Sequence, residues 1–313
     1  ATQIFYEGAP DFPDRGRVWE IIERHGVTVF YTAPTLIRMF MGWGDEWLEG
    51  HDLTGLRLLA TVGEPISRDA WMWYFEQVGG CRCPVIDTWW QTETGGTLIN
   101  ALPGIGPFIP TVAGRSFPGT RHEILDDRGE ALGLGDDPGY LVQRGPFGPG
   151  MLRGIFGNPA MYEENYWTRF GHDAYFSSDG ARYFSEGNFR LTGRLDDVMK
   201  VAGHRLSAAE VENAIATHPD VAECAVVPAP HEIKGETPWA FVRLKDREPS
   251  DELAKELTDQ VVKVLGPTCR PERIVFTAAV PRTRSGKIMR RILKSLVRNE
   301  PVGDTTTIEN PES

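Results

Sequence analysis

The first hundred residues alternate between apolar positions at helical spacing and short apolar runs typical of β-strands. Residues 17–25 (RVWEIIERH) show the helical spacing, and residues 27–31 form a β-rich run. The same pattern continues with a helix at 33–41, a strand at 56–62, a helix at 69–78 capped by Ser67, and a strand at 84–90. This alternation predicts a layered α/β domain with largely parallel strands, in which ligands collect where the strands end.

From about residue 102 to residue 191 the chain changes to short β runs broken by Gly and Pro, which predict a small antiparallel sheet or barrel. A new α+β unit follows. Its expected elements are a helix at 207–217 with Ser207 and Glu210 as a capping box, strands at 222–227, 239–244 and 273–276, a helix at 250–265 and a basic C-terminal helix. We place the boundary at Asp196, so the predicted domains are residues 1–195 and 196–313.

The composition is that of an ordinary globular protein of about two domains. The 313 residues are 41% hydrophobic and 25% charged, with a net charge of -11 and a pI near 5.2. Such an acidic surface repels polyanions, which argues against nucleic acid as a partner. No apolar run approaches the roughly 20 residues of a membrane span, and no secretory segment opens the chain. The four scattered cysteines fit neither a disulfide framework nor paired zinc sites, so we expect a cytoplasmic protein.

A basic segment near the C-terminus reverses the charge of the chain. Residues 281–298 carry seven Lys or Arg side chains and no acidic residue, a pattern that suggests an anionic ligand. Lys287 follows Ser285 and Gly286, whose backbone can bend and present the ammonium group from a loop. An ammonium group in that position can neutralise charge that develops on a phosphate or a carboxylate. The alternatives are a solvated basic helix and nucleic-acid binding, of which the acidic composition disfavours the second.

Two of the predicted strands end in distinctive polar loops, VGEP at residues 62–65 and DTWWQTETGG at residues 87–96. Glu93 lies among hydroxyl side chains ahead of two glycines, and such a loop can hold Mg²⁺ while its hydroxyls and amides meet phosphate oxygens. The alternative is an ordinary polar turn. Trp89 and Trp90 are neighbours on a strand, so we expect one side chain in the core and the other on the wall of a pocket.

Further polar groups lie in predicted turns of the second half. Asp179 and Arg194 suit a ribose diol and a phosphate, although each alone is more often a turn residue or a surface ion pair. Gly203 permits close backbone approach and Arg205 can clamp an anion. His218 is a candidate metal ligand, or simply the end of the helix that begins at Ser207.

Five motifs occur in a fixed order: TVGEP, DTWWQTETGG, YFSSDGAR, TGRLDDVMKVAGHRLSAAEVE and PRTRSGKIMRRIL. With the GDTTTIENP tail they resemble the AMP-forming acetyl-CoA synthetases of the acyl-adenylate-forming superfamily, over essentially the whole chain. The resemblance implies an α/β fold: part of a large layered α/β domain with a β-barrel-like subdomain, then a small α+β domain that swings about Asp196. It also implies that acetate attacks the ATP α-phosphate to give acetyl-AMP and pyrophosphate, and that the CoA thiol then displaces AMP.

The resemblance assigns expected roles to individual residues. Lys287 would be the catalytic residue of adenylation, and acetylation at this position silences the family, so acetylating and deacetylating enzymes are implied partners. Val62 and Trp90 would wall the acyl pocket and restrict it to acetate or another short carboxylic acid. The residues expected to bind ATP, AMP or CoA are Gly63, Glu64, Pro65, Asp87, Thr88, Trp89, Trp90, Gln91, Thr92, Asp179, Arg194, Ala202, Gly203 and Arg205.

Metal ions are also implied. Glu93 would serve Mg²⁺, and a second metal position matches Ala216, His218 and Val221, of which Ala216 and Val221 could offer only carbonyl oxygens. Near the CoA channel the chain departs from many relatives, with Ala202 in place of serine and Val262 in place of an arginine. The CoA contacts are therefore less well specified than the nucleotide contacts.

The chain opens with Ala1 and Thr2, without a Met, and runs directly into the strand-like residues 3–6. The family's phosphate loop, rich in Ser, Thr and Gly, belongs upstream of Ala1. We therefore expect an N-terminally truncated chain that lacks full activity by itself. The alternatives to an acetate-CoA ligase are a propionyl- or other short-chain acyl-CoA synthetase and a non-catalytic adenylate-binding remnant.

Overall fold

A computed structural model describes residues 2–195, 198–201, 204–283 and 288–309 of the chain. The chain packs as two compact units, Ala1–Ser177 with Ala181–Leu191, and Ser178–Gly180 with Thr192–Ser313. Each unit has hydrophobic core clusters of its own. In the described part of the chain, no helix combines the length and the apolar character needed to cross a membrane.

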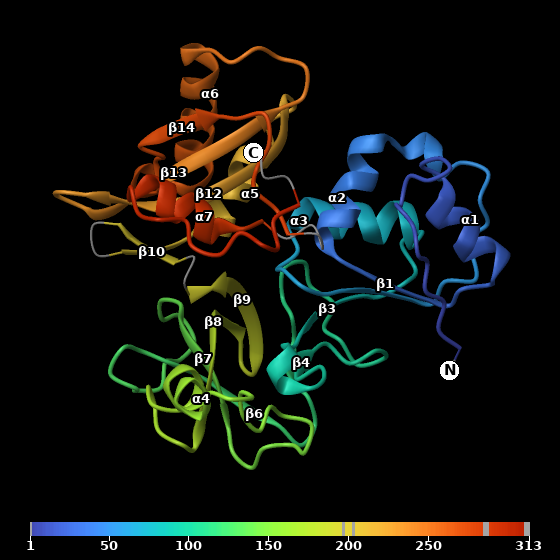
Figure 1. The fold of residues 1–313 in the computed structure, drawn as a ribbon. Helices are drawn as coiled ribbons and strands as arrows, with labels where there is room; N and C mark the ends of the chain where they lie inside the picture. Colours follow the sequence, from blue (N-terminus) through green and yellow to red (C-terminus); the bar gives the residue numbers. More distant parts are fainter. Residues whose placement is uncertain (1, 196–197, 202–203, 284–287, 310–313) are drawn as a thin grey trace. The chain divides into compact units, whose positions relative to one another are not determined.

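Residues 17–116 form a layered α/β region, the class of fold that the alternating pattern of the first hundred residues predicts (Figure 1). In chain order its elements are α1 (Arg17–Arg24), β1 (Val29–Thr32), α2 (Pro34–Trp43), η1 (Asp45–Trp47), β2 (Leu58–Thr61), α3 (Arg68–Trp73), the π-helix η2 (Tyr74–Val78), β3 (Val85–Trp89), the 3-10 turn η3 (Thr92–Thr94), β4 (Ile99–Asn100) and β5 (Arg115–Ser116). β1, β2 and β3 pair in parallel, and β4 and β5 extend the sheet in antiparallel pairing. The strand expected at residues 3–6 is wrong, because these residues join no sheet and have no regular secondary structure.

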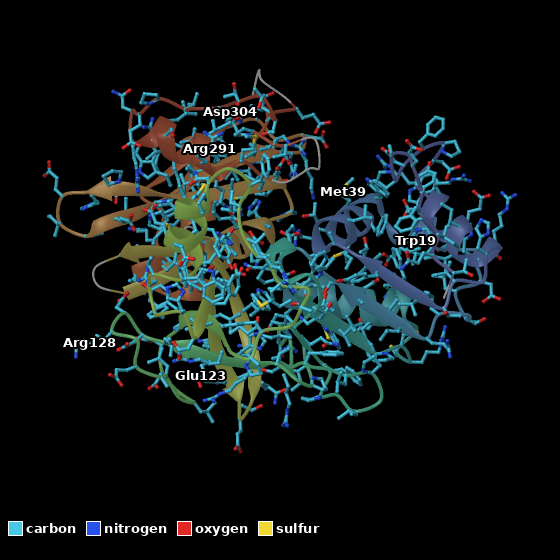
Figure 2. All side chains as sticks on the ribbon, turned by 60° about the horizontal axis from the view of Figure 1, so that its bottom comes forward. Trp19, Met39, Glu123, Arg128, Arg291 and Asp304 are labelled. Atoms are coloured by element: carbon cyan, nitrogen blue, oxygen red, sulfur yellow. The ribbon has the colours of Figure 1, made fainter. Side chains whose placement is uncertain are left out.

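The three helices α1, α2 and α3 pack against β2 and β3 in one core cluster. Trp19 of α1, labelled in Figure 2, is 1% exposed and contacts the rings of Phe30 and Phe40. On the other face of the sheet, Ala60 and Ile86 belong to a separate cluster. Burial on both faces explains why these strands read as nearly continuous apolar runs.

The β-rich region contains β6 (Arg121–Leu125), β7 (Gly139–Arg144), α4 (Pro159–Tyr166), β8 (Ala174–Ser185) and β9 (Asn188–Arg194), of which residues 178–180 and 192–194 are counted with the second unit. The four strands form one sheet in the order β6-β7-β8-β9, and β6 pairs with β7 in antiparallel orientation. The expected small antiparallel sheet is therefore present. The short helix α4 was not predicted. Asn158 caps its N-terminus, where the side-chain oxygen accepts a hydrogen bond from the Met161 N–H at 3.0 Å.

The second unit has the α+β architecture expected for the C-terminal part of the chain, while the domain boundary at Asp196 stays a prediction. Its elements are β10 (Val198–Val201), β11 (His204–Ser207), α5 (Ala208–Ala216), β12 (Val221–His231), β13 (Gly235–Leu244), α6 (Asp251–Leu265), η5 (Pro267–Cys269), β14 (Arg273–Phe276) and α7 (Arg290–Val297). Helices α5 and α6 share one core cluster with the sheet, and α7 packs in another with β12. Arg291 of α7, labelled in Figure 2, donates to the backbone carbonyl of Asp304. The fold class predicted from the sequence is confirmed by these elements and by the structural neighbours described below.

The predicted capping box at the start of α5 is wrong. The Ser207 hydroxyl makes no capping bond to the helix and donates instead to the Thr192 carbonyl at 2.6 Å. The bond to Thr192 turns the hydroxyl toward strand β9, and its oxygen accepts no N–H group from the first turn of the helix. The helix begins at the predicted place without this cap.

Candidate functional site

The carboxyl ends of β1, β2 and β3 lie side by side in the first unit. Thr32 is in register with Thr61, and Thr61 with Asp87. The loop at residues 62–65 leaves β2 at this edge, and the segment that contains Gln91 and Glu93 leaves β3. The structure therefore brings together the two polar loops that the sequence singled out, as expected at the ends of parallel strands.

A chain of hydrogen bonds links the three strand ends. The Thr88 hydroxyl donates to the Thr61 carbonyl at 2.7 Å, and the Tyr31 hydroxyl lies 2.7 Å from Thr88 Oγ1. The Trp90 indole N–H donates to the Tyr31 oxygen at 3.2 Å. Because each hydroxyl has a single proton, the direction of the whole chain follows, from Trp90 through Tyr31 and Thr88 to the Thr61 carbonyl. These bonds hold the exposed Trp90 ring to the sheet.

Trp89 and Trp90 face opposite sides, as their adjacent positions require. Trp89 is 5% exposed and belongs to a core cluster with Ile99, whereas Trp90 is 41% exposed. One tryptophan is thus a core residue, and the other presents an aromatic surface at the strand ends.

Asp87 is buried in the middle of β3, in register with the last residue of β2. Its carboxyl Oδ1 accepts a hydrogen bond from the Thr61 hydroxyl at 2.8 Å, and backbone N–H groups of Thr88 and Ile66 also donate to the carboxyl group. Burial is the largest influence on this group and raises its pKa to about 7, although the hydrogen bonds oppose the shift. The side chain of Asp87 therefore ties β3 to the segment that follows β2.

Glu64, in the loop after β2, is tied to helix α2. Its Oε1 accepts a hydrogen bond from the Thr35 hydroxyl and lies 2.8 Å from the Arg38 guanidinium. Gly63 precedes it with φ +101, a conformation that favours glycine and lets the chain turn out of the strand. Val62 is anchored by its N–H, which donates to the Thr32 carbonyl at 3.1 Å, and Pro65 completes the loop.

The turn after Trp90 is fastened from several sides. The Gln91 side chain and Thr94 cap the 3-10 turn η3 reciprocally, with Thr92 exposed at its start. Glu93 Oε1 accepts a hydrogen bond from the Tyr166 hydroxyl at 2.9 Å, and its backbone carbonyl accepts one from the Leu152 N–H at 2.7 Å. The turn thus holds a partly buried carboxylate in a defined place.

Glu93 offers carboxylate oxygen, the donor that Mg²⁺ prefers. Within the described residues there is no group of three or more His, Cys, Asp or Glu side chains that could enclose a metal ion. A protein site with one carboxylate fits Mg²⁺ that takes its other ligands from water and from substrate phosphates. The role of Glu93 in metal binding stays a prediction.

The expected second metal position lies at the end of α5. The His218 carbonyl accepts a hydrogen bond from the Val221 N–H at 3.1 Å, and the ring Nδ1 accepts one from the Asp220 N–H at 3.3 Å. Nε2 lies 3.7 Å from Glu256 Oε2. Since Nδ1 is an acceptor, Nε2 carries the proton of the neutral ring, so both ring nitrogens have protein partners. The role of Ala216, His218 and Val221 as ligands stays a prediction.

In the second unit, Arg194 Nη1 lies 3.9 Å from Asp179 Oδ1. Asp179 is buried, whereas Arg194 is exposed at the end of β9. The structure therefore places together the two groups that the sequence assigned to ribose and phosphate. Their binding roles stay predictions.

Several predicted residues lie outside the described residues. These are Lys287, the hinge residue Asp196, Ala202 and Gly203. Arg205 lies in β11, and its side chain also falls outside the described part.

Sequence reasoning missed four residues that shape this region: Tyr31, Thr61, Tyr166 and Tyr175. The first two lie at the ends of β1 and β2, so the register of a parallel sheet could have found them. No sheet register could have indicated Tyr166, because it lies in another element and binds Glu93 across 73 residues of sequence. Tyr175 donates to Gln91 Oε1 at 2.8 Å from β8, again without a local signal.

Comparison with known families identifies the class. The family described as AMP-binding enzyme matches residues 1–156, and the family described as AMP-binding enzyme C-terminal domain matches residues 210–287. The chain belongs to these AMP-binding enzymes, in the acyl-adenylate-forming superfamily, and the resemblance read from its motifs is confirmed.

Particular relatives narrow the comparison. Acetyl-coenzyme A synthetase of Rubrobacter xylanophilus is 52% identical over an alignment of 313 positions that covers 99% of this chain and 48% of that protein. The acetyl-coenzyme A synthetase of Rhodopirellula baltica is 49% identical over an alignment of 314 positions that covers 100% of this chain and 46% of that protein. The chain thus spans about half the length of these curated relatives.

Solved structures agree on the fold. The crystal structure of the anthranilate CoA ligase AuaEII in complex with anthranoyl-AMP matches with a TM-score of 0.79 and 28% identity, over 95% of this chain and 55% of that chain. The ATP-bound RpMatB-BxBclM chimera B1 matches with a TM-score of 0.75 and 24% identity, over 91% of this chain and 54% of that chain.

Proposed function

We propose that this chain is part of a cytoplasmic, AMP-forming acetate-CoA ligase. The enzyme converts ATP, acetate and CoA into acetyl-CoA, AMP and pyrophosphate through an acetyl-adenylate. The observation that carries the proposal is the identity of about half of all residues, along the whole chain, with proteins named acetyl-coenzyme A synthetase.

The strand ends of the first unit supply the surface for the acyl group and the nucleotide. Trp90, held by Tyr31, presents a broad ring that shortens the space available to an acid, with Val62 beside it in the proposal. A hydrophobic wall that admits a methyl group and blocks longer chains discriminates by sterics and by lost apolar contact. The loop at residues 62–65 and the backbone from Asp87 to Thr92 would line the adenylate.

The nucleotide's other contacts come from charged groups. Asp179 would accept hydrogen bonds from the ribose hydroxyls, and Arg194 would contact the ribose or phosphate. Glu93 would hold Mg²⁺, which supplies charge neutralisation at the phosphates when it is bound. Ala202, Gly203 and Arg205 would serve the second step, in which the CoA thiol displaces AMP.

Lys287 would carry the electrostatic part of adenylation. The attack brings an acetate carboxylate toward a phosphate group of the same charge sign, and an ammonium group stabilises this encounter as charge builds up. Acetylation would remove that charge and silence the step, so enzymes that acetylate and deacetylate Lys287 are proposed partners.

The test is acid-dependent release of pyrophosphate by the whole protein that contains this chain. With ATP and Mg²⁺ supplied, acetate should give faster release than propionate or butyrate at equal concentration, and added CoA should yield a thioester. Preference for propionate would reassign the substrate within the class. Nucleotide binding without any release of pyrophosphate would refute the ligase activity.

A further inference from the structure

We propose that Tyr166 and Tyr175 are positioning residues that hold the Gln91–Glu93 turn ready for a metal-nucleotide complex. The inference rests on the proposed function, because it assigns to that site two residues that its motifs do not contain. Tyr166 acts on Glu93 and Tyr175 on Gln91, each through its hydroxyl group.

The two tyrosines form a pair before they reach the turn. Tyr166 is the last residue of α4, and Tyr175 lies in β8. Their rings stack with centroids 5.6 Å apart and an interplanar angle of 18°. Tyr175 is 1% exposed and also meets the ring of Trp167, so the stack is anchored in a buried aromatic cluster. Such packing fixes the direction of both hydroxyl groups.

Each hydroxyl then takes one side chain of the turn. The Tyr166 hydroxyl donates to Glu93 Oε1 at 2.9 Å, and the Tyr175 hydroxyl donates to Gln91 Oε1 at 2.8 Å. The Gln91 amide Nε2 donates in turn to the Ser177 carbonyl at 2.7 Å. The amide of Gln91 therefore has a defined orientation, with its oxygen toward the Tyr175 hydroxyl and its nitrogen toward the Ser177 carbonyl.

The backbone of the turn is fixed as well. The Leu152 N–H donates to the Glu93 carbonyl at 2.7 Å, and the next residue but one, Gly95, adopts φ +70. A Cβ atom at Gly95 would lie 2.2 Å from the Gly150 carbonyl oxygen, so the two segments meet at backbone distance. With the main chain held there, the bond from Tyr166 decides which way the Glu93 carboxylate faces.

The consequence is chemical. A carboxylate has about four lone-pair directions, and one hydrogen bond to Oε1 leaves Oε2 able to accept a cation. A ligand whose orientation is set beforehand loses less conformational freedom when it binds a metal ion. Partners that orient a metal ligand typically change metal affinity or activity by roughly 10–100-fold when they are removed.

The test uses Tyr166→Phe, which removes the hydroxyl and keeps the ring stack. Mn²⁺ replaces Mg²⁺, and free Mn²⁺ is measured by electron paramagnetic resonance during titration of the whole protein with ATP present and acid absent. The apparent Kd for Mn²⁺ should rise about tenfold. Tyr175→Phe should give a smaller rise, because its hydroxyl acts on Gln91 rather than on the carboxylate.

Tyr140→Phe is the matched control. Its hydroxyl also donates to a carboxylate, that of Asp127, and its ring packs in the β-rich region, where Tyr140 is buried and Tyr166 partly buried. This variant should bind Mn²⁺ as the wild type does. An unchanged Kd in Tyr166→Phe, or an equal rise in Tyr140→Phe, would overturn the inference.

Steady-state kinetics separate this inference from the proposed function. In Tyr166→Phe the KM for Mg²⁺-ATP should rise more than kcat falls, whereas the KM for acetate should stay close to its wild-type value. If the wild type binds Mn²⁺ and ATP but releases no pyrophosphate with any short acid, the ligase proposal fails, and the Mn²⁺ titration still decides the role of Tyr166.

Discussion

Burial of the Asp87 carboxyl predicts an unusual dependence of stability on pH. In the folded chain the pKa is raised from 3.8 to about 7, chiefly by burial, so between these values the native state holds a proton that the unfolded state has lost. Stability from this group is therefore fully present below about pH 4 and is lost as the pH rises toward 7. Most folded carboxyl groups act in the opposite direction, because their pKa values are depressed.

The size of the effect follows from the shift. Over the roughly three pH units between the two pKa values, each unit corresponds to about 1.4 kcal/mol, so the upper limit is about 4 kcal/mol. Asp87→Asn removes the titration and keeps an oxygen for the Thr61 hydroxyl. The new amide nitrogen cannot accept the hydrogen bonds that backbone N–H groups donate to the carboxyl group in the wild type. This loss lowers the free energy of unfolding by about 1–3 kcal/mol at every pH. The pH dependence, rather than the offset, is the predicted quantity.

Urea denaturation followed by tryptophan fluorescence measures it. Of the nine tryptophans only Trp239 lies outside the first unit, so the signal reports mainly on that unit. From pH 5 to pH 8 the free energy of unfolding of Asp87→Asn should rise by about 2–3 kcal/mol relative to the wild type. Asp137→Asn, in an exposed loop, is the control and should show no comparable trend. A constant difference between Asp87→Asn and wild type across this range would refute the buried, protonated carboxyl.

Three further predictions concern the site. Trp90→Gly should raise the ratio of kcat/KM for butyrate over acetate at least tenfold; an unchanged ratio would remove Trp90 from the acyl wall. Gly95→Ala should lower the free energy of unfolding by about 1–3 kcal/mol, because Gly95 has φ +70 and lies against the Gly150 backbone. Gly96→Ala is the control and should keep the wild-type stability, because the space around Gly96 is open. Equal urea midpoints for the two variants would contradict this prediction. Lys287→Ala should slow acid-dependent pyrophosphate release roughly 10²–10³-fold while thioester formation from supplied acetyl-AMP continues, and full activity in the first assay would disprove its role.

Much of the fold could be predicted because local patterns carried it. From α1 to β3 the helices and strands follow from apolar periodicity, although residues 3–6 do not form the expected strand. Ser67 does cap α3, with its oxygen accepting from the Ala70 N–H. Helix α4 was not predicted, because it is only eight residues long and contains no buried residue that would form an apolar stripe. Its Asn158 cap and the following proline were the available signals.

Residues of the candidate site that lie in a motif could be singled out from the sequence, whereas the partners that tertiary packing brings to them could not. Glu93 and Trp90 stand in a recognisable segment, but their partners Tyr166 and Tyr31 come from elements 73 and 59 residues away in sequence. Ser207 is the opposite case, in which a local pattern predicted a bond that is not made. Its spacing to Glu210 fits a capping box, but its hydroxyl donates to Thr192 on another strand. Hydrogen bonds between distant segments depend on register and packing, which single-residue patterns do not encode.

The hydrogen-bonded chain from Trp90 to the Thr61 carbonyl joins the three strands through Thr88 and Tyr31 and only ends at Trp90. Mutation of Trp90 would therefore affect the strands less than mutation of Thr88 or Tyr31. Thr88 joins β3 to β2 and meets Tyr31 of β1, whereas Trp90 adds its N–H only to the outermost oxygen. A smaller side chain at position 90 would leave the fastening of the three strands intact. With Trp90 as the proposed wall of the acyl pocket, variation at this position would change the acids that fit with little penalty in folding, so one scaffold could diversify its substrates.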